Sequence, residues 1–291
     1  MGVLIGPETR VLCQGITGRM GTFHSERMIA YGTQLVGGVR PGKGGTRHLN
    51  LPVFDTVSEA VEETGANASA IFVPPDYAAA AMVEAIEAEV PLVVCVTERV
   101  PVLDMVRVRH ALSRSKTRLV GPNSQGVLAP GSCKIGVMPS IHERPGRIGI
   151  ASRSASLTSE VVEQTSQFKL GQSTTVGIGG DPVHGLSLAE CVELFLADSE
   201  TDGVILLGEI GGAEEEEAAD FVRSAKTRKP VVGFVAGRHA PRERRMGHAG
   251  TLDVFASGDA ESKIEALRAA DVLIAHDAAA IGETMRRALL S

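Results

Sequence analysis

The sequence contains no tryptophan, and aromatic residues make up only 3% of its 291 residues. This scarcity argues against recognition that depends on stacking bases or sugars on aromatic rings. Basic residues are not in excess either, because 29 lysines and arginines stand against 35 aspartates and glutamates, and the net charge is −6. A chain with this charge is not expected to bind nucleic acid through its phosphates.

Cysteines are also few. Cys13, Cys95, Cys133 and Cys191 lie far apart and form no CxxC pair. We therefore expect neither a zinc site nor a disulfide framework, and scattered cysteines suit a reducing compartment. The eight histidines show no HxxxH or HExxH spacing, which argues against a metal site.

Long apolar runs are missing as well. No apolar stretch reaches the roughly 18 residues that a membrane span needs. The first residues, MGVLIGPETRV at 1–11, lack the basic and apolar regions of a signal peptide. These features predict a cytoplasmic protein without a membrane partner, and a matrix protein that has lost its transit peptide is the alternative.

What the sequence does contain is a regular alternation of short apolar runs and longer helical patterns. In the first half, strands are expected at 10–14, 34–39, 69–74, 91–96 and 118–122, with helices such as 76–89 and 101–114 between them. In the second half, strands are expected at 147–152, 173–179, 203–210 and 230–237, with helices near 156–168, 186–198 and 214–225 and a last helix–strand–helix across 259–290.

This alternation predicts parallel sheets with helices on both faces. The segment 127–149 is rich in glycine and proline and breaks the rhythm, so we interpret it as the connection between domains. The sequence therefore predicts two α/β domains, at 1–130 and 131–291. Ligand sites are expected at the carboxyl ends of the strands in each.

The first expected strand leads into a glycine loop, QGITGRMG at 14–21, which opens a helix. Glycines there let the backbone approach a phosphate, and the helix N-terminus supplies N–H groups and a partial positive charge. The spacing is GxxGxxG, a weak signal by itself, and a simple strand-to-helix turn is the alternative.

The end of the second expected strand carries Arg40 and Lys43, where a site that prefers NAD usually has Asp or Glu. Two cations on a glycine-rich loop favour a nucleotide with a phosphorylated ribose, which means NADP or coenzyme A. A solvated basic loop is the alternative.

Polar residues follow other strands too. Thr97 and Glu98 either contact an adenine or ribose edge or cap the next helix. Ser154, Ser156 and Thr158 resemble helix N-cap residues, and the same geometry also makes an anion site.

His248 lies on a glycine-flanked stretch, RRMGHAGTL at 244–252, which is not built like a core segment. Imidazole is nucleophilic near neutral pH and can carry a phosphoryl group. Glu209 ends an apolar strand just before two glycines, where a carboxylate could orient a histidine or accept its proton. The two residues are candidates for catalysis, and an exposed loop histidine is the alternative.

Five runs of sequence together resemble the α subunit of succinyl-CoA synthetase across nearly the whole chain. They are CQGITGRMGTFHSE at 13–26, AYGTQLVGGVRPGKGG at 30–45, TVGIGGDP at 175–182, GEIGG at 208–212 and RMGHAG at 245–250. The combination of the last two is far more specific than either glycine loop alone. The resemblance implies an N-terminal Rossmann-like CoA-binding domain followed by a flavodoxin-like parallel α/β domain.

The resemblance also implies a reversible ligase that makes acyl-CoA, NDP and phosphate from a carboxylic acid, coenzyme A and NTP. The histidine that is phosphorylated in this family matches His248, and the carboxylate that holds it matches Glu209. The implied CoA contacts are Thr17, Gly18, Arg19, Met20, Lys43, Val96, Thr97 and Glu98. ATP or GTP with Mg would bind a separate ATP-grasp β subunit in an αβ or α2β2 assembly.

The match is imperfect where the phosphate and the acid would bind, a site implied to comprise Ser154, Ala155, Ser156, Ser159, Asn123, Ser124 and Gln125. The family commonly reads GPNCPG and SRSGTLTYE, whereas this chain reads GPNSQG at 121–126 and SRSASLTSE at 152–160. Loss of the tyrosine ring at Ser159 opens volume, and Gln125 adds hydrogen-bonding groups. These changes predict an acid that is bulkier or more polar than succinate, such as malate, itaconate or citrate.

Three alternatives stay open at this point. One is a malate–CoA ligase or another acid–CoA ligase. The second is a catalytically impaired CoA-binding paralogue, because the segment 251–263 also departs from the family pattern. The third is an NADP-binding protein, which the lack of an evident reductase site disfavours.

Overall fold

The structure is a computed structural model that describes residues 2–226, 229–240, 248, 251 and 258–291. The chain forms two compact units. The N-terminal unit comprises Leu4–Met138 with Val183–Leu186, and the C-terminal unit comprises Pro139–Pro182 and Ser187–Ser291 with Met1–Val3. The domain boundary expected after residue 130 stays a prediction.

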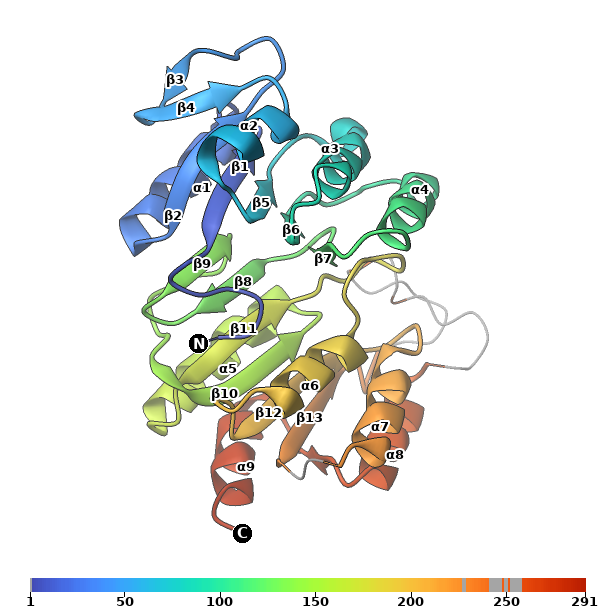
Figure 1. The fold of residues 1–291 in the computed structure, drawn as a ribbon. Coiled ribbons are helices and arrows are strands. Elements are labelled where there is room, and N and C mark those ends of the chain that lie inside the picture. The colour runs from blue at the N-terminus through green and yellow to red at the C-terminus, as the bar shows by residue number, and fades with distance from the viewer. Residues whose placement is uncertain (1, 227–228, 241–247, 249–250, 252–257) are drawn as a thin grey trace. The chain divides into compact units, whose positions relative to one another are not determined.

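A parallel sheet forms the centre of the N-terminal unit (Figure 1). Its strands, in spatial order, are β3 (Arg47–His48), β4 (Leu51–Phe54), β2 (Gln34–Val39), β1 (Arg10–Gln14), β5 (Ala68–Ile71), β6 (Leu92–Cys95) and β7 (Arg118–Val120). All neighbours pair in parallel except the short β3 with β4. Without β3 the order is 3-2-1-4-5-6, that of a dinucleotide-binding fold, which confirms the Rossmann-like prediction.

Four helices connect these strands: α1 (Arg19–Tyr31), α2 (Val57–Thr64), α3 (Pro75–Glu87) and α4 (Val102–Leu112). Their ends follow local rules. Thr56 and Glu59 form a capping box at the start of α2. Pro75 occupies the first position of α3, and Gly32 ends α1 in the left-handed conformation. The helices therefore begin and end where their own residues favour it.

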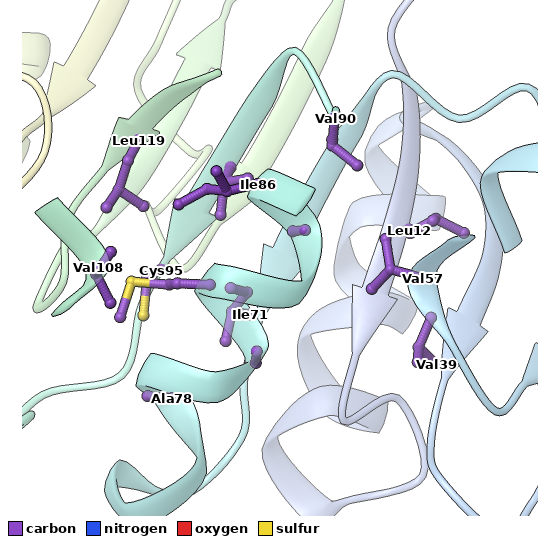
Figure 2. Close-up of a cluster of buried hydrophobic side chains, with 14 of the residues drawn as sticks. Leu12, Val39, Val57, Ile71, Ala78, Ile86, Val90, Cys95, Val108 and Leu119 are labelled. Atoms are coloured by element: carbon purple, nitrogen blue, oxygen red, sulfur yellow. The ribbon is translucent and has the colours of Figure 1, made fainter. Parts of the chain in front are cut away.

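Apolar side chains from the sheet and the helices form the core of this unit. Leu12 of β1, Ile71 of β5 and Cys95 of β6 are fully buried, together with Ala78 of α3 and Val108 of α4 (Figure 2). Parallel strands covered on both faces are expected to be apolar throughout, and the burial of every residue of β5 and β6 fits that rule.

The sequence suggested that the glycine-rich segment 127–149 only connects the domains, but the structure shows a β-hairpin at its start. In this hairpin, β8 (Gly126–Ala129) pairs with β9 (Cys133–Gly136) in antiparallel fashion. Gly126 and Gly136 have φ angles of 110° and 118°, and a Cβ on Gly126 would lie 2.0 Å from the carbonyl oxygen of Ile135. These glycines permit close contact between the two strands. The sequence alone did not distinguish glycines with that role from the glycines of a flexible linker.

The C-terminal unit repeats the architecture with a different strand order. Its strands run β14 (Leu273–Ile274), β13 (Val231–Ala236), β12 (Gly203–Glu209), β10 (Pro145–Ser152) and β11 (Gln172–Gly177), all paired in parallel. Its helices are α5 (Ala155–Gln167), α6 (Leu188–Ala197), α7 (Glu214–Ser224), α8 (Ala260–Ala269) and α9 (Ile281–Ala288), with a short η2 (Ala278–Ala280). Counted along the chain the order is 2-1-3-4-5, which is the predicted flavodoxin-like topology.

The core of the C-terminal unit includes Ile150, Ile205 and Val232 from the sheet, with Val161 of α5 and Ile281 of α9 packed against them. Among the described residues, no helix combines the length and the apolar character needed to cross a membrane.

The burial of Leu12 gives a stability prediction with a matched control. Leu12→Ala is expected to lower the free energy of unfolding by about 2–5 kcal/mol, because it leaves a cavity in the core of the N-terminal unit. The same change at Leu103, which is 77% exposed on α4, is expected to cost no more than about 0.5 kcal/mol. Denaturant unfolding measures both, and equal losses would contradict this account of the core.

Candidate active site

The carboxylate of Glu209 binds the imidazole of His248. Glu209 is the last residue of β12, and its two oxygens lie 2.9 and 2.8 Å from Nδ1 of His248. The His248 side chain is 31% exposed and that of Glu209 is 10% exposed. The structure thus brings together the two residues that the sequence nominated for catalysis.

Three neighbouring strands end around this pair. Gly180 follows β11 and approaches the ring so closely that a Cβ there would lie 2.0 Å from Nδ1 of His248. Arg153 follows β10, and its guanidinium lies 3.3 Å from the Glu209 carboxylate. The strand order changes direction at β10, so the pair occupies the topological switch point of the sheet, where α/β folds bind ligands.

The contact with Glu209 fixes the chemistry of the histidine ring. An ionised carboxylate only accepts hydrogen bonds, so Nδ1–H donates to Glu209 and the lone pair of the neutral ring lies on Nε2. The hydrogen bond that Nδ1–H donates to Glu209 raises the pKa of His248 above its ordinary value, against the effect of burial and of the Arg153 charge. Nε2 is therefore the nitrogen that can attack an electrophile such as phosphorus.

The backbone of His248 is also held. The hydroxyl of Thr251 donates to the carbonyl oxygen of His248 over 2.7 Å, and the amide of Thr251 reaches the same oxygen over 3.2 Å. The surrounding residues 241–247, 249–250 and 252–257 lie outside the described part of the chain.

The start of α5 carries the hydroxyl groups that the sequence pointed to. Ser154 caps the helix by accepting a hydrogen bond from the amide of Leu157 over 3.4 Å. Ala155 and Ser156 are exposed in the first turn, and Ser159 donates to the carbonyl oxygen of Ala155 over 3.3 Å. The capping interpretation of Ser154 is confirmed, and the exposed first turn still offers N–H groups to an anion.

In the N-terminal unit, the glycine loop after β1 makes a tight turn into α1. Gly15 has a φ of 83°, and a Cβ on Gly21 would lie 2.1 Å from the carbonyl oxygen of Gly15. Gly18 is the N-cap of α1, and no side-chain hydrogen bond caps this helix end. Thr17 is half-buried there, and Gly18, Arg19 and Met20 are exposed.

A cavity of about 450 Å³ opens beside this loop, at the carboxyl ends of β1, β2 and β5. Gln14, Gly15, Arg40 and Tyr77 are among the residues that line it. Its place is again a switch point, between β1 and the strands on either side. The cavity is large enough for part of a nucleotide.

The basic loop after β2 is shaped by an aspartate that the sequence analysis missed. The Asp55 carboxylate accepts hydrogen bonds from the amides of Lys43 and Gly44, over 3.0 and 2.9 Å. The amide of Gly44 contributes most to lowering the pKa of Asp55. Lys43 itself is exposed. Asp55 could have been suspected only from its place directly after the short strand β4.

The remaining predicted residues lie at the ends of β6 and β7 in the N-terminal unit. Val96 and Thr97 are half-buried and Glu98 is exposed; Thr97 donates to the carbonyl oxygen of Val73 over 2.7 Å. The amide of Asn123, a residue with a φ of 55°, donates to the carbonyl oxygen of Thr97. Ser124 and Gln125 are buried, and the carbonyl oxygen of Gln125 accepts from Val137 and Met138.

Sequence comparison places this arrangement in a family. The CoA binding domain family matches residues 7–99, and the CoA-ligase family matches residues 151–273. Succinate–CoA ligase (ADP-forming) subunit alpha from Aquifex aeolicus (strain VF5) is 49% identical over 291 residues, which cover 99% of this chain and 95% of that protein. The chain belongs to the succinate–CoA ligase α-subunit family. Another member, from Staphylococcus aureus (strain N315), is 48% identical over 98% of this chain and 94% of its own length.

Solved structures of other proteins show the same fold. ATP citrate lyase from Methanothrix soehngenii, in complex with citrate and coenzyme A, has a TM-score of 0.90 at 23% identity. The match covers 99% of this chain but 50% of the lyase chain, so this chain spans about half of that protein. The dinucleotide forming acetyl-coenzyme A synthetase 1 of Ca. Korarchaeum cryptofilum has a TM-score of 0.78 with ADP and phosphate bound.

The His248–Glu209 contact predicts the effect of neutralising the carboxylate. Glu209→Gln is expected to lower the pKa of His248, because a neutral amide stabilises the protonated ring less than a carboxylate does, while burial and the Arg153 charge still lower the pKa. An NMR titration of the full chain with ¹³C-labelled histidine measures this. Glu217→Gln, at an exposed carboxylate of α7, is the matched control and should leave the titration unchanged. An unchanged midpoint in Glu209→Gln would contradict the assignment.

Proposed function

We propose that this chain is the α subunit of an NDP-forming acid–CoA ligase of the succinyl-CoA synthetase type, with His248 as the phosphoryl carrier. The observation that carries the proposal is the bond from Nδ1 of His248 to Glu209 at a strand-end switch point. Membership of the succinate–CoA ligase α-subunit family supports the reaction class.

In the first step, Nε2 of His248 attacks the terminal phosphorus of the NTP. A P–N bond forms, the P–O bond to the leaving NDP breaks, and Nδ1–H stays bonded to Glu209. Glu209 therefore offsets the positive charge that develops on the ring. Because the neutral ring is the nucleophile, this step is expected to slow as the pH falls through the raised pKa of His248.

In the second step, an oxygen of the carboxylic acid attacks the phosphorus, so that the P–N bond breaks and an acyl phosphate forms. The thiol of coenzyme A then loses its proton and attacks the acyl carbon, and phosphate leaves. The first turn of α5, with Ser154 and the exposed Ser156, is proposed to bind the phosphoryl group through helix N–H groups. Ala155, Ser159, Asn123, Ser124 and Gln125 are the other proposed phosphate or acid contacts.

Coenzyme A is proposed to bind the N-terminal unit, beside the glycine loop and the 450 Å³ cavity. The open N-terminus of α1 would hold its pyrophosphate through the amides of Thr17–Met20, and Lys43 would neutralise a phosphate. Val96, Thr97 and Glu98 complete the proposed contacts. The match of the CoA binding domain family to residues 7–99 supports this placement.

The nucleotide is proposed to bind a separate subunit. The related proteins are named as alpha subunits, which supports a partner chain. We propose an ATP-grasp β subunit that binds ATP or GTP with Mg and assembles as αβ or α2β2 in the cytoplasm. No nucleic-acid partner is proposed.

The acid is proposed to be a di- or tricarboxylate. Succinate is named for the related α subunits, and citrate for the lyase of the same fold. Ser159 presents a small polar side chain on the first turns of α5, where the family commonly has tyrosine. A more polar acid such as malate, itaconate or citrate is therefore the second candidate.

The phosphohistidine is tested by mixing the chain with its partner subunit and ATP labelled at the γ-phosphate. A base-stable, acid-labile label is expected on His248, and adding acid and coenzyme A should discharge it. His248→Asn should abolish the label, whereas His239→Asn is the matched control and should keep it. Coenzyme A binding without any label would instead indicate a non-catalytic CoA-binding paralogue.

The acid is identified by assaying a panel of acids with coenzyme A, each NTP and the partner subunit. The altered residues predict a higher kcat/KM for malate, itaconate or citrate than for succinate, and Ser159→Tyr should shift the preference towards succinate. The expected change in the free energy that discriminates between the two acids is about 1–3 kcal/mol, which is typical of gaining or losing one small contact in a binding pocket. A preference for succinate in the unaltered chain would contradict the reading of Ser159.

A further inference from the structure

Glu209 contacts a network of buried charged side chains that has no role in the proposed reaction steps. The side chains of Glu215 and Lys263 are 0% exposed, and that of Arg153 is 4% exposed. Arg153 lies 3.1 Å from one oxygen of Glu215, and Lys263 lies 2.5 Å from the other. Buried charges are costly unless they are paired, so a fully buried chain of this kind needs a structural or functional reason.

The three side chains hold the backbone of the GEIGG turn at separate points. The Glu215 carboxylate accepts the amide of Glu209 itself over 2.9 Å. Arg153 donates to the carbonyl oxygen of Gly211 over 3.1 Å, and Lys263 donates to that of Gly212 over 2.8 Å. The turn that carries the histidine-binding carboxylate is therefore held at Glu209 itself and at the two glycines that follow it, Gly211 and Gly212.

The turn itself is adapted to this arrangement. A Cβ on Gly208 would lie 2.5 Å from Cγ of Glu215, so glycine is needed where the Glu215 side chain crosses the end of β12. Gly258 precedes α8, and its carbonyl oxygen accepts the amide of Gly211 over 2.8 Å. Gly258, five residues before Lys263, therefore contacts the same turn that Lys263 contacts.

The network leaves a net negative charge next to the imidazole. Its members around His248 are two cations and three carboxylates: Arg153, Lys263, Glu209, Glu215 and Glu216. Asp181, from the loop after β11, also acts on His248 and favours its protonation. With the ring protonated, His248 balances the five charges of this network, and Asp181 adds one further negative charge.

We propose that Glu215 and Lys263 are positioning residues of the phosphoryl-transfer site, which act through Arg153 and the GEIGG turn to keep the Glu209 carboxylate on Nδ1 of His248. This inference rests on the proposed function. It assigns to α7 and α8 the task of fixing both the place and the charge of the group that orients the nucleophile.

The alternating charges give opposite signs for the two single variants. Glu215→Gln removes a buried negative charge and frees Arg153 to act on Glu209 alone, so the pKa of His248 should fall. Lys263→Met removes a buried positive charge, so the pKa of His248 should rise. The double variant Glu215→Gln/Lys263→Met removes a matched pair, and its titration should return towards that of the unaltered chain.

The experiment is an NMR titration of His248 in the full chain with ¹³C-labelled histidine. Each single variant is expected to shift the midpoint by about half a pH unit or more, in the stated direction. The isosteric Glu215→Gln and the charge-balanced double variant decide the matter if Lys263→Met does not fold. Leu267→Ala is the matched control. Leu267 is a fully buried apolar residue of α8, the helix that carries Lys263, so this variant disturbs the packing of the helix without altering a charge.

Turnover with the partner subunit supplies the second readout. Each single variant is expected to lower kcat about tenfold or more, with an unchanged KM for coenzyme A, and the double variant to recover part of the loss. Single variants that titrate like the unaltered chain, or a Leu267→Ala variant that shifts His248 equally, would overturn the inference. A chain that shows the shifts but forms no phosphohistidine would retain the positioning role and refute the proposed function instead.

Discussion

The bond between the Glu209 carboxylate and Nδ1 of His248 is the interaction on which the site depends. It gives a histidine on a glycine-flanked segment a defined tautomer and raises the pKa of its ring. The fold makes the bond possible because β12 delivers Glu209 to the sheet edge, and Gly180 leaves the ring room that a Cβ would fill. A parallel sheet places such groups together without any nearness in sequence.

The two units have different strand orders, and each has its candidate site at the switch point of its own sheet. The N-terminal unit has the order of dinucleotide-binding folds, with a glycine loop, an uncapped helix N-terminus and a cavity at its switch point. The C-terminal unit has the flavodoxin-like order, with His248 and Glu209 at the switch point of its sheet. The proposed recognition of coenzyme A and the proposed storage of a phosphoryl group would then both use the carboxyl ends of strands at a switch point.

Much of this could be predicted from the sequence, because apolar periodicity and glycine placement are local signals. The alternation gave both parallel sheets, and Glu209 stood out as a charged residue at the end of an apolar strand. The hairpin β8–β9 was missed because glycines that permit close strand contact look like linker glycines. Asp55, Arg153, Glu215 and Lys263 were missed because their roles depend on contacts between distant segments. Glu215 also lies in a run of four glutamates, a pattern that is typical of the acidic first turn of a helix.

The most direct test of the account is to find the atom that bears the phosphoryl group. The chain, with ¹⁵N-labelled histidine, would be phosphorylated by ATP and its partner subunit, and ³¹P–¹⁵N coupling would identify the nitrogen. The geometry predicts coupling to Nε2 of His248, with the proton of Nδ1 still held by Glu209. A phosphoryl group on Nδ1, or on another residue, would contradict the central claim.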